Sequence, residues 1–212
     1  FDSTATQKIL DKAKIRVPQP EDYAWRLWDY WERHLDPDLS IDRSLRGAVK
    51  GKVVMITGGS SGIGEAAAIR IADAGGKVIV VARDEEKLAE AKRAFEADGL
   101  ELVAYSADIS DYAQCDDFVR QVNEEYGGVD ILINNAGRSI RRAIENSFDR
   151  FHDFERCMQL NYFAALRLTM GFLPKMIEKK KGHIVNISSI GVLTNAPRFS
   201  AYVASKSALE AY

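Results

Sequence analysis

From residue 51 onward, the sequence alternates between short runs rich in β-branched residues and longer amphipathic stretches. Such alternation is typical of parallel β/α units, in which each strand is followed by a helix that carries the chain back across the sheet. Most of the short runs are apolar nearly throughout, as expected for strands buried on both faces. We therefore predict an α/β protein with at least five strands, at residues 52–57, 77–82, 100–106, 129–134 and 182–188.

The segments between these runs predict the helices. Residues 62–76 and 84–99 have helical spacing and end in glycine, which is a common helix stop. We expect the longest helix at residues 152–180, with Pro174 near its end.

The first fifty residues differ from the rest because they lack strand alternation. Trp28, Trp31 and Leu35 fall on one helical face, and Asp36-Pro37 ends the segment. We expect this aromatic stripe to be buried against a core, because aromatic residues at helical spacing normally are. A platform that stacks a ligand is the alternative.

Composition excludes several classes of protein. The 29 basic residues nearly balance the 31 acidic ones, so no bulk charge attracts nucleic acid or an anionic membrane. Cys115 and Cys157 are far apart and lack the spacing of a zinc site or a disulfide framework, which fits a reducing cytoplasm. The three histidines are dispersed, so no metal site is expected. No apolar run approaches the roughly 18 residues of a membrane span.

A glycine-rich turn follows the first predicted strand directly. Residues 57–64 read TGGSSGIG, with glycines at 58, 62 and 64. Glycines let the backbone turn tightly and approach a pyrophosphate, whose charge then lies at the N-terminus of the next helix. In this context the motif predicts a dinucleotide-binding loop rather than an ordinary strand–helix turn. A nucleoside triphosphate loop is excluded, because no Gly-Lys-Ser/Thr follows.

The end of the second strand distinguishes the two nicotinamide cofactors. An acidic residue there accepts the ribose 2′-hydroxyl of NAD, whereas an arginine accommodates the 2′-phosphate of NADP. Arg83 occupies this position and favours NADP(H). The neighbouring Asp84 keeps NAD(H) possible, and a solvated arginine is the structural alternative.

These motifs and those that follow resemble the short-chain dehydrogenase/reductase family. The resemblance covers residues 51–212 and includes TGGSSGIG and the NNAG motif at 134–137. It also includes Asn161 in LNYFAAL, Ser189, and the YVASK segment that begins at residue 202. The resemblance implies a Rossmann-type doubly wound parallel sheet with strand order 3-2-1-4-5.

The same residues make chemical sense as a catalytic set. A free tyrosine has a pKa of about 10, so proton exchange near neutral pH requires a nearby cation. Lys206 follows Tyr202 by four residues and shares its helical face. Ser189 comes just after the fifth strand and could bond a substrate oxygen. In the family, the position of Asn161 holds a water that connects the lysine to solvent and lies where the helix bends; a simple helix cap or kink is the alternative.

The resemblance also implies a set of cofactor contacts. Asp108 resembles the position that contacts adenine, although such an aspartate also starts turns. Asn135, Ala136 and Gly137 pass beside the adenosine ribose in the family. The predicted cofactor-binding residues are Gly58, Ser60, Ser61, Gly62, Ile63, Gly64, Arg83, Asp108, Ile109, Asn135, Ala136, Gly137, Tyr202 and Lys206.

Three arginines follow the NNAG motif closely. Arg138, Arg141 and Arg142 could meet an anionic substrate such as a phosphopantetheine or coenzyme A thioester. A solvated loop is the alternative.

The organisation expected along the chain has two parts. Residues 1–46 resemble a helical extension or linker from an upstream module, and residues 47–212 resemble the catalytic domain. In the family, further strands and a mobile lid follow the Tyr/Lys helix, so we expect this domain to be truncated at its C-terminus. The junction between the two parts resembles bacterial two-module reductases, some of which act on fatty acyl-CoA or fatty aldehydes.

The function expected from the sequence is therefore an NADP(H)-dependent oxidoreductase. Its substrate would be an aliphatic carbonyl or alcohol, such as a fatty aldehyde, a ketone or an acyl derivative. The alternative is a noncatalytic dinucleotide-binding module that supports a neighbouring domain. Family members commonly form dimers or tetramers, so we expect a cytoplasmic homo-oligomer.

Overall fold

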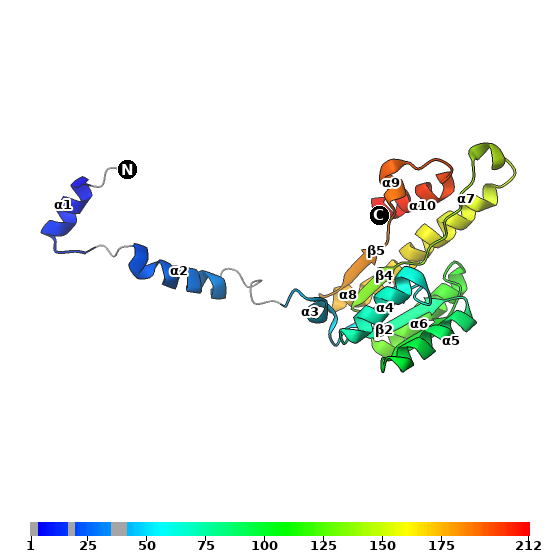
Figure 1. Ribbon diagram of the computed structural model, residues 1–212, viewed down its shortest axis with the longest axis horizontal. Helices are drawn as coiled ribbons and strands as arrows, with labels where there is room; N and C mark the ends of the chain where they lie inside the picture. The colour runs from blue at the N-terminus through cyan, green and yellow to red at the C-terminus, as the bar shows by residue number, and fades with distance from the viewer. Residues whose placement is uncertain (1–3, 17–19, 35–41) are drawn as a thin grey trace. The chain divides into compact units, whose positions relative to one another are not determined.

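The computed structural model describes residues 4–16, 20–34 and 42–212 (Figure 1). The chain divides into two compact units, Phe1–Arg43 and Ser44–Tyr212. None of the helices in the described ranges is long and apolar enough to cross a membrane.

The N-terminal unit contains helices α1 (Thr4–Lys12) and α2 (Pro20–His34). The rings of Trp28 and Trp31 contact each other, with centroids 5.2 Å apart. Both side chains nevertheless remain exposed, at 61% and 38%. Leu35, the third residue of the expected aromatic stripe, and Asp36-Pro37, the expected end of the helix, lie outside the described part of the chain.

The second unit is built on a five-stranded parallel sheet with order β3-β2-β1-β4-β5, which confirms the predicted class and strand order. The strands are β1 (Val53–Thr57), β2 (Lys77–Ala82), β3 (Leu102–Ser106), β4 (Ile131–Asn134) and β5 (His183–Asn186). Each lies within a predicted run. In the central strand, Val54 pairs with Val78 on one side and with Ile131 on the other.

Helices cover both faces of the sheet, because alternate strand residues point to opposite sides. Met55 packs in the cluster formed with α6 (Tyr112–Tyr126) and α8 (Ala165–Glu178). Its neighbours Val54 and Ile56 pack in the cluster formed with α4 (Gly62–Asp73) and α5 (Glu85–Ala97). The other helices of this unit are α3 (Leu45–Val49), α7 (Phe151–Met158), α9 (Ile190–Thr194) and α10 (Ser200–Ala211), together with the 3₁₀ turn η2 (Ile144–Asn146).

The longest helical segment runs without a break from Phe151 to Glu178, close to the predicted 152–180. It comprises α7, the π-helical turn η3 (Gln159–Ala164) and α8, with Pro174 inside α8. A π-helical turn is wider than an α-helical one and often occurs at functional sites. Asn161, where the sequence suggested a bend, lies in this turn.

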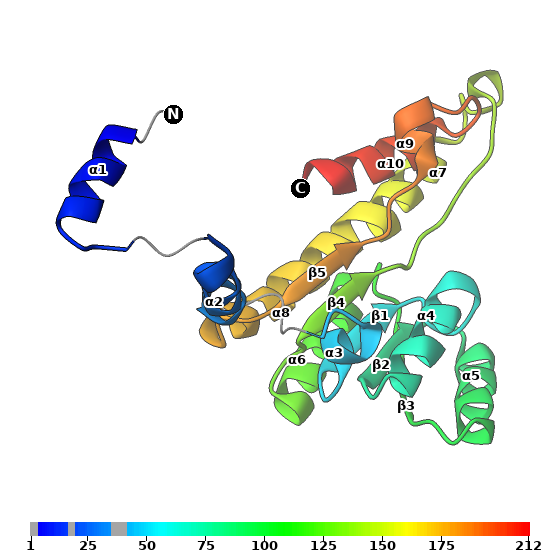
Figure 2. The same cartoon turned by 60° about the vertical axis from the view of Figure 1, so that its left-hand side comes forward.

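Helix α10 packs along α7 and η3, as Figure 2 shows. This position brings the second half of α10 to the segment that follows β5. Lys206 and Asn161 therefore contact the segments that follow β5 and β4, at the edge where parallel sheets commonly bind ligands.

Candidate active site

The glycine-rich turn after β1 needs glycine for two separate reasons. Gly58 has a positive φ of 65°, which side chains rarely allow. At Gly64, a Cβ atom would lie 2.3 Å from the Gly58 carbonyl oxygen, so the first turn of α4 can approach the loop only without a side chain. The result is a bare backbone cradle at the N-terminus of α4, which suits a pyrophosphate.

The NNAG segment is fastened to this cradle. The Asn135 amide nitrogen Nδ2 donates to the carbonyl oxygens of Thr57 and Gly58 at 2.9 and 3.2 Å. In return, the Thr57 hydroxyl accepts from the backbone nitrogens of Asn135 and Ala136 at 2.9 and 2.8 Å. Thr57 thus fixes two loops relative to each other, a role that the sequence did not reveal.

A cleft of about 440 Å³ opens over these loops. Most of the predicted cofactor residues line it: Gly58, Ser60, Ser61, Ile63, Gly64, Arg83, Asp108, Ile109, Asn135, Ala136 and Gly137. Gly62, Tyr202 and Lys206 are not among its lining residues. The lining also contains Asp84, which the sequence analysis had weighed as favouring NAD(H), and residues that it missed: Val81, Ala82, Lys87, Ala107 and Leu160. Ala82 directly precedes Arg83 in the sequence, whereas Leu160 belongs to η3 and has no local sequence signal.

Charged side chains of both signs line the cleft. Arg83 Nη1 lies 3.5 Å from Asp108 Oδ2, and Lys87 Nζ lies 3.7 Å from Asp84 Oδ2. Burial alone would raise the pKa of the Asp108 carboxyl, but hydrogen bonds from Ser110 and the Arg83 charge outweigh it and lower this pKa. Asp108 is therefore charged at neutral pH and already occupies part of the Arg83 guanidinium.

Lys206 is buried, with 3% of its surface exposed. Its Nζ donates to the Ile187 carbonyl oxygen at 2.6 Å. A Cβ on Gly137 would lie 3.5 Å from the same Nζ, so the ammonium reaches the end of the cleft where Gly137 lies. Burial lowers the pKa of Lys206, since it disfavours the charged form.

Asn161 connects α10 to the loop after β4. Its Oδ1 accepts from the Arg138 backbone nitrogen at 2.7 Å, and its Nδ2 donates to the Arg138 carbonyl oxygen at 2.9 Å. Nδ2 also donates to Ser205 Oγ at 2.8 Å, next to Lys206 in α10. Asn161 is buried, so these bonds position both segments. The predicted link to a water stays a prediction.

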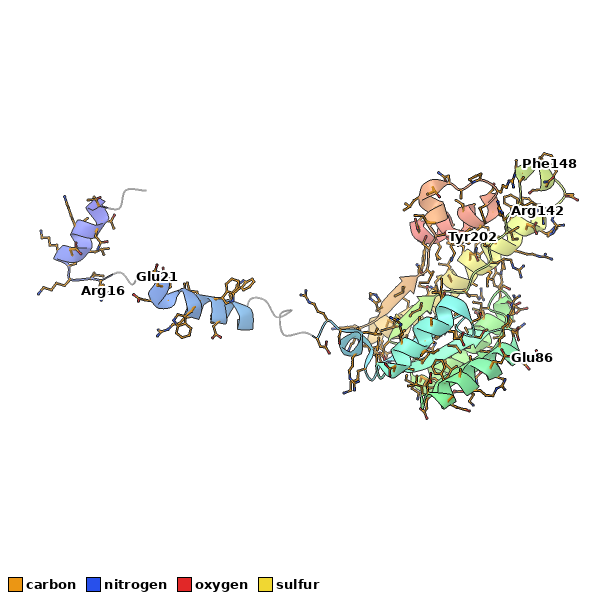
Figure 3. All side chains as sticks on the ribbon, in the orientation of Figure 1. Arg16, Glu21, Glu86, Arg142, Phe148 and Tyr202 are labelled. Carbon is orange, nitrogen blue, oxygen red and sulfur yellow. The ribbon has the colours of Figure 1, made fainter. Side chains whose placement is uncertain are left out.

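Two of the predicted catalytic side chains, Tyr202 and Ser189, carry hydroxyl groups that are available for a ligand. Tyr202 is half-buried on α10 (Figure 3), and its hydroxyl forms no hydrogen bond within the described residues. Ser189 caps the N-terminus of α9 and accepts from the Gly191 nitrogen at 3.1 Å. Among the described residues, nothing accepts the Ser189 hydroxyl proton, so this proton can be donated to a substrate oxygen.

The three arginines after the NNAG motif separate in the structure. Arg142 Nε lies 3.2 Å from Asp153 Oδ2, and its backbone nitrogen donates to the Arg198 carbonyl oxygen at 2.7 Å. Asp153 is buried and also pairs with Arg150 at 3.1 Å, a hydrogen bond that lowers the pKa of Asp153. Arg142 therefore holds the fold together, whereas Arg141 is exposed and Arg138 faces a second hollow beside the cleft.

Known proteins are similar to this chain in sequence and in fold. A family model described as short chain dehydrogenase matches residues 52–212. A fatty acyl-CoA reductase from Acinetobacter baylyi is 56% identical over 172 residues, which are 81% of this chain and 58% of that protein. The chain spans 48% to 61% of the length of the curated relatives that it matches.

Solved structures agree with the sequence relatives. A metagenomic short-chain oxidoreductase in complex with NADP superposes with a TM-score of 0.72 and 33% identity, over 77% of this chain and 74% of that chain. A NAD⁺-bound xylitol dehydrogenase superposes with a TM-score of 0.71 and 29% identity, over 76% and 62% of the two chains.

Proposed function

The chain belongs to the short-chain dehydrogenase/reductase family of oxidoreductases, and on this premise we propose that it uses NADP(H) to interconvert an aliphatic carbonyl compound and its alcohol. The observation that carries the proposal is the buried ammonium of Lys206 beside Gly137, one helical turn from Tyr202. That ammonium adjoins the cleft, and it is carried by the same helix as a tyrosine whose hydroxyl has no hydrogen bond within the described residues.

The cleft residues would hold the cofactor. The backbone cradle from Gly58 to Gly64 suits the pyrophosphate, and Asp108 with Ile109 suits the adenine. Bound NADPH would supply the hydride. The fit is supported by a cradle that a side chain at Gly64 would fill.

The proton chemistry follows from the chain's own residues. In reduction, Tyr202 donates its proton to the carbonyl oxygen while Ser189 donates a hydrogen bond to the same oxygen. The positive charge of Lys206 lowers the cost of the phenolate that Tyr202 becomes. Asn161 holds α10 and the loop at Arg138 in register, and we propose that it also supports the path of the proton to solvent.

The preference for NADP(H) is supported by two cations, Arg83 and Lys87, at the cleft wall. The neighbouring Asp84 and Asp108 partly neutralise them, so NAD(H) should be bound more weakly rather than rejected. An aliphatic substrate, such as a fatty aldehyde, a ketone or an acyl derivative, is supported by similarity to a fatty acyl-CoA reductase.

We also propose that residues 1–46 form a helical extension to a catalytic domain at residues 47–212, and that this domain self-associates. The exposed apolar residues Phe163, Met170 and Ile177 recur every seven residues along η3 and α8. This spacing is typical of helices that pack against another helix. The stripe borders a hollow of about 380 Å³ that also includes Leu166. A second copy of the chain would cover it.

The test is Tyr202→Phe in the purified protein, assayed with NADPH and a panel of aliphatic aldehydes and ketones. Because the proton donor is lost, turnover should fall about 100-fold or more, whereas the affinity for NADPH should stay within about twofold. Tyr212→Phe is the matched control, since Tyr212 ends the same helix and is exposed. Unchanged turnover in Tyr202→Phe, or NADPH binding without any turnover in the parent protein, would favour a noncatalytic binding module.

A further inference from the structure

A second hollow of about 430 Å³ lies beside the cofactor cleft. We call it the arginine pocket because three of its lining residues are arginines. The lining residues are Arg83, Ser110, Arg138, Arg156, Gln159 and Leu160. These residues come from the segments that follow β2, β3 and β4 and from α7 and η3. Arg83 and Leu160 also line the cleft, so the two spaces are neighbours.

The arginine pocket has more positive charge than the protein neutralises. Arg83 lies 3.5 Å from Asp108, but Arg138 and Arg156 have no carboxylate within 4.0 Å among the described residues. Like charges around one hollow repel each other, and an anion between them would relieve this repulsion. The pocket is therefore electrostatically complementary to a ligand with more than one negative charge.

Hydrogen bonds fix the walls of the pocket. Gln159 Nε2 donates to the Ser110 carbonyl oxygen at 2.8 Å, which ties η3 to the segment after β3. Asn161 holds the backbone of Arg138 on both its nitrogen and its oxygen. Because these walls are already ordered, a ligand would have to immobilise only the arginine side chains.

The chemistry of the lining indicates which anion fits. Guanidinium groups present a planar set of donors that matches phosphate in a bidentate manner. Arg138 and Arg156, which have no carboxylate partner among the described residues, suit a phosphate ester or a diphosphate better than a single carboxylate, whereas Arg83 is shared with the cofactor cleft. Leu160 adds an apolar surface against which the remainder of an organic ligand can lie.

We propose that the arginine pocket binds the phosphate groups of a phosphorylated substrate while the cofactor occupies the neighbouring cleft. The inference rests on the proposed function, because it takes the cleft as the cofactor site. It extends that function by assigning the substrate a negatively charged handle outside the reacting centre. Binding energy at such a handle orients the reacting part of the substrate.

The experiment is calorimetric titration of the purified protein with pyrophosphate and with adenosine 3′,5′-bisphosphate, at low ionic strength and at saturating NADPH. Arg156→Gln is the informative variant because Arg156 does not line the cleft. The matched control is Arg141→Gln, which removes the same charge from an exposed position outside the pocket. Both probes should bind alongside NADPH. Arg156→Gln should weaken them about 10-fold or more, and Arg141→Gln less than about twofold, given the usual strength of charged hydrogen bonds.

Several results would overturn the proposal. Probes that bind only by displacing NADPH would assign the pocket to the cofactor. The same conclusion would follow if Arg156→Gln weakened the affinity for NADPH but not the affinity for NADH. Equal losses in the two variants would indicate diffuse surface charge, and absent binding would mean that no anion site exists. Failure to bind NADPH would contradict the proposed function instead, and the same probes titrated without cofactor would still test the pocket.

Discussion

At the scale of single residues, the proposed chemistry depends on one buried charge. Lys206 has 3% of its surface exposed and donates to a backbone carbonyl, and burial lowers its pKa. Its positive charge favours the phenolate that Tyr202 becomes in the proposed reaction. This stabilisation of the phenolate requires the protonated lysine. It is therefore present below the lowered pKa of Lys206 and is lost as the pH rises through that pKa.

Lys206→Met removes the charge while retaining an unbranched side chain. Without this charge the phenolate is less favourable, so the pH profile of alcohol oxidation, which needs the phenolate, should shift to higher pH, with a far larger loss of rate at neutral than at alkaline pH. The pH profile of turnover in the oxidation direction checks this shift. Lys179→Met is the control, because Lys179 is exposed beyond α8. A uniform loss across the pH range would contradict the electrostatic role.

Arg83→Gln tests cofactor preference at the same scale. Loss of one charged donor to the 2′-phosphate should weaken NADPH about 10-fold or more, with little effect on NADH, which lacks that phosphate. Fluorescence titration with both cofactors measures the ratio. The exposed Arg93 of α5, which does not line the cleft, provides the control variant Arg93→Gln. Equal weakening of both cofactors would place Arg83 against the adenine instead.

At the scale of elements, η3 couples the long helix to α10. Asn161→Ala removes three hydrogen bonds to Arg138 and Ser205 from a buried site. Because buried partners are left unpaired, the free energy of unfolding should fall by about 1–3 kcal/mol. Denaturant unfolding measures this loss, with the exposed Asn146→Ala of η2 as the control. Equal stability of the two variants would show that α10 is held by other contacts.

At the scale of the whole molecule, the stripe on η3 and α8 should control assembly. Met170 is 63% exposed at its centre, so Met170→Lys should convert dimers or tetramers to monomers without lowering monomer stability. Sedimentation velocity measures the shift. Leu193→Lys is the control, because Leu193 is 79% exposed on α9, away from the stripe. A parent protein that is monomeric at high concentration would contradict the assignment.

Much of this protein follows from local sequence. Runs such as 77–82 are strands because β-branched residues suit a sheet, and glycine at 58 and 64 is needed for a bare loop next to a helix. The glycine-rich motif at 57–64 and the NNAG motif at 134–137 predict the cleft from the sequence. These features depend on a few neighbouring residues, so a single segment carries the signal.

Only the tertiary structure determined which distant side chains share a site. Asn161 bonds Arg138 and Ser205, which are 23 and 44 residues away. Arg142 pairs with the buried Asp153, whereas Arg138 and Arg156 both line the arginine pocket. No local pattern distinguishes these arginines, because their partners are chosen by how helices pack across the sheet. Sequence therefore determined the elements and the motifs, and packing decided which charges are paired and which remain to receive a ligand.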